Sequence, residues 1–193
     1  KICKERNIWL HIDGSIGGIF AITKIPINGI SNINCANSIT INPQKILGIT
    51  KTSSILLVSN LEVLKKTFAT GLPYLSSENN VLNRGEIGIQ GSRPAEIIKL
   101  WLGLRFLGMK GIENVLGSSI ERRTFLENNL NKEKYDLFSG PLHIISFLPK
   151  GMNKNESDVW TSNKRINLMN NNFMLSRPIF KNRYFLRAVL GNY

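Results

Sequence analysis

Short apolar runs, separated by Gly, Asn and Pro, dominate the first half of the chain. Residues 8–12, 38–41 and 54–58 are such runs, and each predicts a buried strand. Continuous apolar strands of this kind are typical of a sheet that is covered on both faces. The glycine-rich residues 13–18 predict a tight bend directly after the first strand.

Helical spacing of apolar residues follows. Ile97, Leu100, Trp101 and Leu104 recur at helical spacing, which predicts a helix that ends at Gly108 and carries Trp101 and Leu104 in its core stripe. Further helices are expected at 61–68 and 112–130, whereas 71–91 lacks periodicity and predicts a long loop. A loop of that length in a compact domain is usually functional or mobile.

The second half predicts fewer elements. Strands are expected at 142–148 and 184–190, and the polar residues 151–172 give only a weak helical signal around 158–168. The composition changes near 108–111, where we place the domain boundary. The order of elements predicts an α/β fold followed by a smaller α+β part.

The charge of the chain suggests one class of partner that its distribution does not support. The 193 residues include 25 Lys and Arg against 13 Asp and Glu, giving a net charge of +12. Such a balance is typical of nucleic-acid binding, but the basic residues are scattered and no aromatic-plus-basic RNA motif is present. We therefore expect no nucleic-acid partner, with a nucleic-acid binder kept as a weaker alternative.

Other classes are excluded by simple features. No stretch approaches the roughly 18 apolar residues of a membrane span, so we expect no membrane partner. Two cysteines, Cys3 and Cys35, are too few for a disulfide framework, and no His/Cys spacing suggests a metal. A reduced, cytoplasmic location is the default. Because the chain begins at Lys1 without a signal peptide or an initiator Met, we expect a fragment.

One acidic and one basic residue stand where a cofactor could use them. Asp13 follows the first predicted strand, and Lys45 follows the Pro43 that stops the second. Pyridoxal phosphate needs a lysine for its covalent link and a carboxylate that keeps its pyridine nitrogen protonated. On spacing alone the signal is weak, since such residues are more often solvated or capping groups.

Two segments around these residues resemble a known family. Residues 9–18, Trp-Leu-His-Ile-Asp-Gly-Ser-Ile-Gly-Gly, resemble the His-Val-Asp-Ala-Ala-aromatic-Gly-Gly segment of the group II pyridoxal-phosphate-dependent amino acid decarboxylases. Residues 36–45, Ala-Asn-Ser-Ile-Thr-Ile-Asn-Pro-Gln-Lys, resemble the segment whose lysine carries the cofactor. Further matches follow in order at 73–75, 89–93, 99–102, 111–113 and 185–187.

The resemblance covers essentially the whole chain and implies a fold. It implies fold type I, the aspartate-aminotransferase-like fold of pyridoxal-phosphate enzymes. Residues 1–108 would form the C-terminal part of the cofactor-binding large domain, and 109–193 an incomplete small α+β domain. The family's large domain begins well before Lys1, so we expect this segment alone to bind the cofactor poorly and not to turn over.

The resemblance also implies catalytic roles. Lys45 would hold pyridoxal 5'-phosphate covalently, and Asp13 would pair with its protonated pyridine nitrogen. Tyr74 matches the tyrosine of the family's mobile loop, which returns a proton to the substrate Cα after carbon dioxide leaves. Arg187 matches an arginine near the substrate carboxylate, although a strand-edge salt bridge is an equally good reading of it.

The remaining implied contacts surround the cofactor. Ser15 stands where the family usually has Ala against one face of the ring, and Gln44 replaces the His that helps hold the cofactor or its phosphate. Asn42 and His11 complete the cofactor-binding candidates, although His11 alone is more typical of a structural histidine. Arg93 receives no role.

The implied function is decarboxylation of an L-amino acid to an amine and carbon dioxide by a cytoplasmic homodimer. The residues do not choose among acidic, basic and aromatic substrates. One alternative is a lyase or aldehyde synthase on the same scaffold, against which Tyr74 argues. Another is an inactive fragment or paralogue that acts as a dimer partner or regulatory subunit, which the departures at Asn37 and Gln44 favour.

Overall fold

The computed structural model describes residues 1–49, 54–73 and 83–191. They form two compact units. The first contains residues 1–21, 29–44 and 49–106, and the second contains residues 22–28, 45–48 and the chain from 107 onward. The assignment of 1–108 to a large domain and of 109–193 to a small one stays a prediction.

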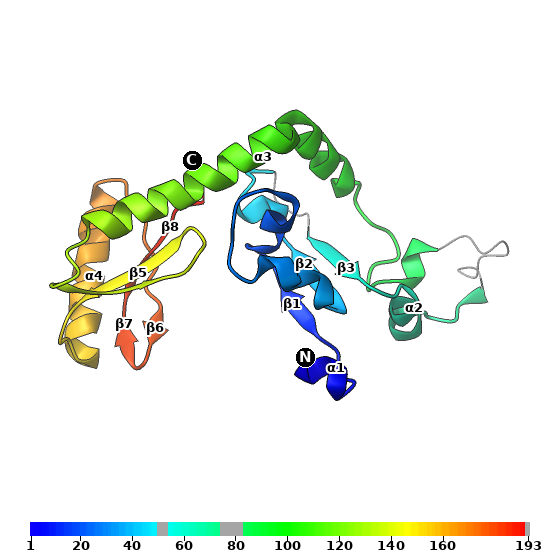
Figure 1. The fold of residues 1–193 in the computed structure, drawn as a ribbon, viewed down its shortest axis with the longest axis horizontal. Coiled ribbons are helices and arrows are strands. Elements are labelled where there is room, and N and C mark those ends of the chain that lie inside the picture. The colour runs from blue at the N-terminus through cyan, green and yellow to red at the C-terminus, as the bar shows by residue number, and fades with distance from the viewer. Residues whose placement is uncertain (50–53, 74–82, 192–193) are drawn as a thin grey trace. The chain divides into compact units, whose positions relative to one another are not determined.

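A three-stranded sheet forms the centre of the first unit (Figure 1). Its order is β1 (His11–Asp13), β2 (Ser38–Ile41) and β3 (Ile55–Val58). β1 and β2 are parallel, with Asp13 opposite Thr40, whereas β3 is antiparallel to β2. The carboxyl ends of β1 and β2 therefore meet at one edge of the sheet, which is where ligands bind in open α/β sheets.

The predicted strands at 38–41 and 54–58 are confirmed, but the first is wrong at its start. Ile8 and Trp9 lie outside β1, and their side chains are 53% and 46% exposed. The backbone N–H of Leu10 donates to the side chain of Asn37 instead of a ladder partner, at 2.8 Å. An apolar run therefore located the strand without locating its first hydrogen-bonded residue.

Short helices complete this unit around a small apolar core. The α-helices are α1 (Ile2–Glu5) and α2 (Glu62–Phe68), so the helix predicted at 61–68 is confirmed. The 3-10 helices are η1 (Gly18–Ile22), η2 (Ile30–Cys35), η3 (Pro43–Lys45) and η5 (Arg84–Glu86). Ile19, Phe20, Ile49 and Leu100 are the buried apolar residues of this unit.

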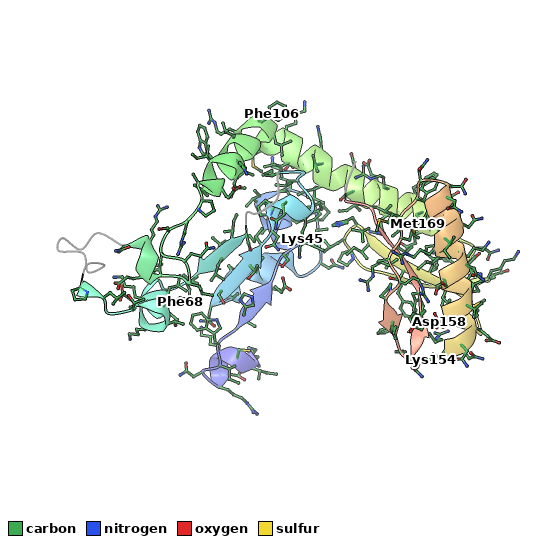
Figure 2. All side chains as sticks on the ribbon, turned by 180° about the vertical axis from the view of Figure 1, so that it is seen from behind. Lys45, Phe68, Phe106, Lys154, Asp158 and Met169 are labelled. Carbon is green, nitrogen blue, oxygen red and sulfur yellow. The ribbon has the colours of Figure 1, made fainter. Side chains whose placement is uncertain are left out.

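The two predicted long helices are both present within α3 (Glu96–Asn129), and the break between them falls at Gly108, as predicted. Gly108 has φ 59° and ψ 179°, a non-helical conformation open to glycine. The predicted core stripe is wrong for Trp101, which is 59% exposed, whereas Leu100 is buried. Phe106 is 90% exposed and is labelled in Figure 2. None of the helices described is long and apolar enough to cross a membrane.

The second unit is built on an antiparallel sheet of order β4-β5-β8. Its strands are β4 (Tyr135–Ser139), β5 (Ile144–Pro149) and β8 (Leu186–Val189), and a hairpin of β6 (Ile179–Phe180) and β7 (Arg183–Tyr184) precedes β8. The strand predicted at 142–148 is confirmed as β5. The strand predicted at 184–190 is divided, because Tyr184 belongs to β7. Pattern analysis did not predict β4 or β6.

The weak helical signal near 158–168 corresponds to a long helix, α4 (Lys154–Asn170), along which Lys154, Asp158 and Met169 are labelled in Figure 2. A capping box begins it: the Asn153 side chain accepts from the Glu156 N–H, and the Glu156 carboxylate accepts from the Asn153 N–H. Its buried residues are Ser157 and Thr161. Hydroxyl groups at the buried positions explain why the apolar periodicity of α4 is weak.

His143 lies in the interior of the second unit. It is fully buried, and neither ring nitrogen has a hydrogen-bond partner among the described residues. Gly191 packs against the ring, since a Cβ there would lie 2.8 Å from Nε2. Burial lowers the pKa of His143, and the positive charge of Arg122 lowers it further. The folded state therefore disfavours the protonated imidazole.

We expect the free energy of unfolding to fall as the pH drops below about 6.5, the ordinary pKa of histidine. Below that pH the unfolded state binds a proton at His143 more readily than the folded state does. One such proton changes the free energy of unfolding by at most about 1.4 kcal/mol per pH unit. Glu127 does not act in this window. Its lowered pKa, caused mainly by the Ser139 hydroxyl, gives stability that is lost only below its ordinary 4.5.

Urea titrations from about pH 8 to about pH 5 measure this slope. His143→Phe should flatten this dependence on pH, because it removes the buried imidazole. Equal slopes in His143→Phe and the unchanged protein would contradict the assignment.

Candidate functional site

The bend after β1 holds the first candidate residue in a defined local geometry. Asp13 is the last residue of β1, and its side chain is exposed. The backbone N–H of Ser15 donates to Asp13 Oδ1 at 3.0 Å, and the Ser15 hydroxyl donates to the same oxygen. The carboxylate is thereby oriented by its own loop.

Two glycines let this bend lie directly on β2. A Cβ at Gly14 would stand 2.9 Å from the carbonyl oxygen of Thr40 and 3.0 Å from Cα of Gly18. A Cβ at Gly18 would stand 2.9 Å from the Ile41 side chain. Contacts this short leave no room for any side chain, so both positions require glycine for close approach.

His11 is tied to β2 through both ring nitrogens. Nδ1 lies 2.7 Å from Ser38 Oγ, and Nε2 lies 3.3 Å from Thr40 Oγ1. Trp9 Nε1 donates to the same Ser38 oxygen at 2.9 Å. The tautomer of the His11 ring decides which partner donates in each of these two contacts. These contacts fit a structural histidine, and its cofactor role stays a prediction.

Asn42 and Gln44 lie between β2 and the lysine. The backbone N–H of Asn42 donates to the carbonyl of Ser15 at 3.1 Å, and its side-chain oxygen accepts from Ser54 at 2.7 Å. Asn42 therefore fastens the bend after β1 to the end of β2. The Gln44 side chain is half-buried, and its Oε1 is buried without a hydrogen-bond partner among the described residues.

Lys45 is the last residue of η3 and is labelled in Figure 2. Only Asn42 separates η3 from the end of β2. Lys45 is exposed, and none of the ion pairs between described residues involves it. Lys45 belongs to the second unit, whereas Asp13, Ser15, His11, Asn42 and Gln44 belong to the first. Ile46 and Leu47, directly after the lysine, are buried.

Arg187 lies in β8, opposite Ser146 of β5. Its backbone exchanges hydrogen bonds with Ser176, at 2.9 and 3.1 Å. None of the ion pairs between described residues involves Arg187, so the salt-bridge reading of it finds no support there. The backbone is fully engaged, and the guanidinium is half-buried.

A cavity of about 220 Å³ adjoins Arg187 within the second unit. Three phenylalanines line it, and their rings pack edge to face with centroids 5.2 Å apart for Phe138 and Phe180 and 5.3 Å apart for Phe138 and Phe185. Ser146 and Arg187 are its polar residues; Pro178 and Ile179 complete the lining. An apolar pocket with one cation suits a carboxylate carried on an organic group.

Two comparisons with known proteins identify the family. The model for the pyridoxal-dependent decarboxylase conserved domain matches residues 1–142. An aromatic-L-amino-acid decarboxylase of Bacillus atrophaeus is 31% identical over 137 residues, which is 69% of this chain and 28% of the relative. The chain belongs to the pyridoxal-dependent decarboxylase family.

Solved structures agree on the fold. The Catharanthus roseus tryptophan decarboxylase, solved in complex with L-tryptophan, is 20% identical with a TM-score of 0.78; the match covers 98% of this chain and 41% of that one. The Rhodiola rosea 4-hydroxyphenylacetaldehyde synthase is 18% identical with a TM-score of 0.80, covering 98% and 40%. The predicted fold class, α/β of fold type I, is confirmed. The chain spans less than half the length of these relatives.

Asn37 and Gln44 are two of the described positions that depart from the family pattern. Asn37 replaces an acidic residue, but its side-chain oxygen accepts from Leu10 N–H, a bond that a carboxylate would make equally well. Gln44 keeps a polar side chain where the family has His. Tyr74 lies outside the described residues, so its role stays a prediction.

Sequence reasoning left Arg93 without a role and did not single out Ser38 or Thr40. The Arg93 guanidinium donates to the carbonyls of Gln90, at 3.1 Å, and Arg84, at 2.9 Å. It thus organises the loop before α3. Arg93 stands inside a matching family segment, which was the available signal. Ser38 and Thr40 could have been found because they alternate on β2, opposite His11 and Asp13.

We expect Gly14→Ala to destabilise the first unit and to displace the Asp13 carboxylate, because the new methyl group meets the Thr40 carbonyl. Forced overpacking of this kind costs about 1–3 kcal/mol. Gly91→Ala is the matched control, since nothing lies within 4 Å of a Cβ there. Equal urea midpoints for the two variants would show that the bend does not lie on β2 as described.

Proposed function

We propose that this chain supplies the covalent lysine and the ring-nitrogen partner of pyridoxal 5'-phosphate in an enzyme that decarboxylates an L-amino acid to an amine and carbon dioxide. One observation carries the proposal. The carboxylate of Asp13 closes β1 beside Thr40 of the parallel β2, and the turn directly after β2 ends at Lys45. Family membership and the order of these two residues support it.

The residues present fit this cofactor. Asp13 carries an oriented carboxylate, which is the group that a protonated pyridine nitrogen needs. Lys45 offers an exposed amine with no ion-pair partner among the described residues. The buried, unpartnered Oε1 of Gln44 marks a polar side chain whose hydrogen bonds the described residues leave incomplete, and such groups normally find a partner.

The chemistry divides between the cofactor and the chain. When bound, pyridoxal phosphate supplies an electron sink for the charge left on Cα after carbon dioxide departs. Lys45 would hold the cofactor covalently through its Nζ amine. Asp13 keeps the proton on the ring nitrogen by its negative charge. Tyr74 returns a proton to Cα, and Arg187 binds a substrate carboxylate through its guanidinium fork.

One relative favours a second product. The Rhodiola rosea match is an aldehyde synthase, so the same scaffold serves a reaction with an aldehyde product. Tyr74 favours the amine for this chain. An inactive dimer partner or regulatory subunit remains the alternative from another class, and the departures at Asn37 and Gln44 favour it.

We also propose a cytoplasmic homodimer. The two free cysteines, Cys3 and Cys35, suit a reducing compartment. The apolar residues Ile97, Trp101 and Phe106 on the first half of α3 are more than half exposed, which is typical of a surface that other protein covers.

The test compares the full-length protein with Lys45→Ala, using Lys150→Ala, at an exposed loop lysine, as the control. We expect the unchanged protein and the control to show visible absorbance of bound cofactor and to release an amine from at least one of the common L-amino acids. Lys45→Ala should lose that absorbance, and amine formation should fall by about three orders of magnitude or more.

The same assay separates the alternatives. An aldehyde in place of the amine would select the synthase. An unchanged absorbance band in Lys45→Ala would remove the lysine assignment, and full-length protein with neither cofactor nor product would favour the inactive partner.

A further inference from the structure

The hydroxyl of Ser15 is an addition to the family pattern. The family usually has Ala at this place, and Ala cannot donate a side-chain hydrogen bond. Here the hydroxyl donates to Oδ1 of Asp13, beside the backbone N–H of the same residue, which donates to Oδ1 at 3.0 Å. One carboxylate oxygen therefore receives two donors from a single residue.

The backbone of Ser15 is held against the end of β2. Its carbonyl accepts from the Asn42 N–H at 3.1 Å, and Asn42 is itself held by Ser54 at 2.7 Å. Gly14 lies against the Thr40 carbonyl, which leaves the bend no room to shift toward β2. The Ser15 side chain is half-buried next to the carboxylate.

We propose that Ser15 is a positioning residue that acts through Asp13 and weakens the hold of this carboxylate on the proton of the cofactor's ring nitrogen. The inference rests on the proposed function. A hydroxyl that donates to a carboxylate stabilises its negative charge, and a carboxylate stabilised in this way attracts a neighbouring proton less strongly. The ring nitrogen then loses its proton at a lower pH than it would beside an Asp13 without the hydroxyl.

The competing local explanation is a turn motif. Asp and Ser both favour turns by bonding to nearby backbone, and the N–H of Ser15 alone completes such a turn. In that case the hydroxyl would affect only the stability of the bend. Ser15→Ala separates the two explanations, because it keeps the backbone donor and removes only the hydroxyl.

His11 is a titratable neighbour of Asp13 on β1. His11, two residues earlier, lies on the same side of β1 and is engaged by Ser38 and Thr40 of β2. That engagement does not involve Ser15, so the substitution leaves it in place.

The experiment uses the full-length protein loaded with pyridoxal phosphate that carries ¹⁵N in the ring. The ¹⁵N chemical shift reports ring-nitrogen protonation, and it is recorded against pH for the unchanged protein, Ser15→Ala and Ser15→Thr. At fixed pH, we expect the ring ¹⁵N signal of Ser15→Ala to lie closer to the value of the protonated ring. We expect the midpoint of its titration to be about one pH unit higher, a tenfold change in the proton affinity of the ring nitrogen. Ser15→Thr retains a hydroxyl and should follow the unchanged protein.

Each other outcome overturns the inference. Identical shifts and midpoints in Ser15→Ala and the unchanged protein would leave the hydroxyl no influence on the ring, whether or not the melting temperature falls. Loss of cofactor from Ser15→Ala would contradict the stronger hold expected of Asp13. Absence of a cofactor signal from the unchanged protein is distinguishable from both, since it refutes the proposed function and this inference with it.

Discussion

Close contact between the bend after β1 and the end of β2 is the constraint on which the candidate site depends. Gly14 and Gly18 let the backbone lie on Thr40 and Ile41, and the Asn42 N–H closes the contact on the Ser15 carbonyl. The register of β1 on β2 then places Asp13 at the sheet edge where the chain continues toward Lys45.

Polar side chains, more than apolar packing, fasten this edge. The chain Trp9–Ser38–His11–Thr40 ties the two strands together on one side, and Asn37 receives the N–H of Leu10 at their start. Among its described residues the first unit buries few apolar side chains, so these directional bonds carry much of its local geometry. Directional bonds suit a site, because they fix side-chain orientation as well as position.

The pattern of the chain predicted those features that depend on residue type alone. β-branched runs located β2, β3 and β5, and ordered motifs led to Asp13 and Lys45. The limits of β1 could not be predicted, because Ile8 and Trp9 are apolar but do not pair with β2 in the strand ladder. The length of α4 was missed because its buried residues Ser157 and Thr161 bond through hydroxyls; the capping box of Asn153 and Glu156 was the available signal.

Contacts that depend on how the elements are arranged in three dimensions could not be predicted from the sequence. Trp101 has the spacing of a core residue but is exposed. The spacing of apolar residues predicts which of them share a helix face, but it does not show whether another element covers that face. The contact of Ser15 with a face of the cofactor ring stays a prediction, and the hydrogen bond from its hydroxyl to Asp13 was not predicted. This hydrogen bond depends on the tight bend and could not be derived from residue spacing.

The proposal that Asp13 and Lys45 bind one cofactor is tested most directly by a crystal structure of the full-length protein with pyridoxal phosphate. The account predicts a covalent link from Lys45 Nζ and an Asp13 carboxylate oxygen about 2.7–3.0 Å from the ring nitrogen. A cofactor attached to another lysine, or a ring nitrogen that faces solvent or a different side chain, would contradict it.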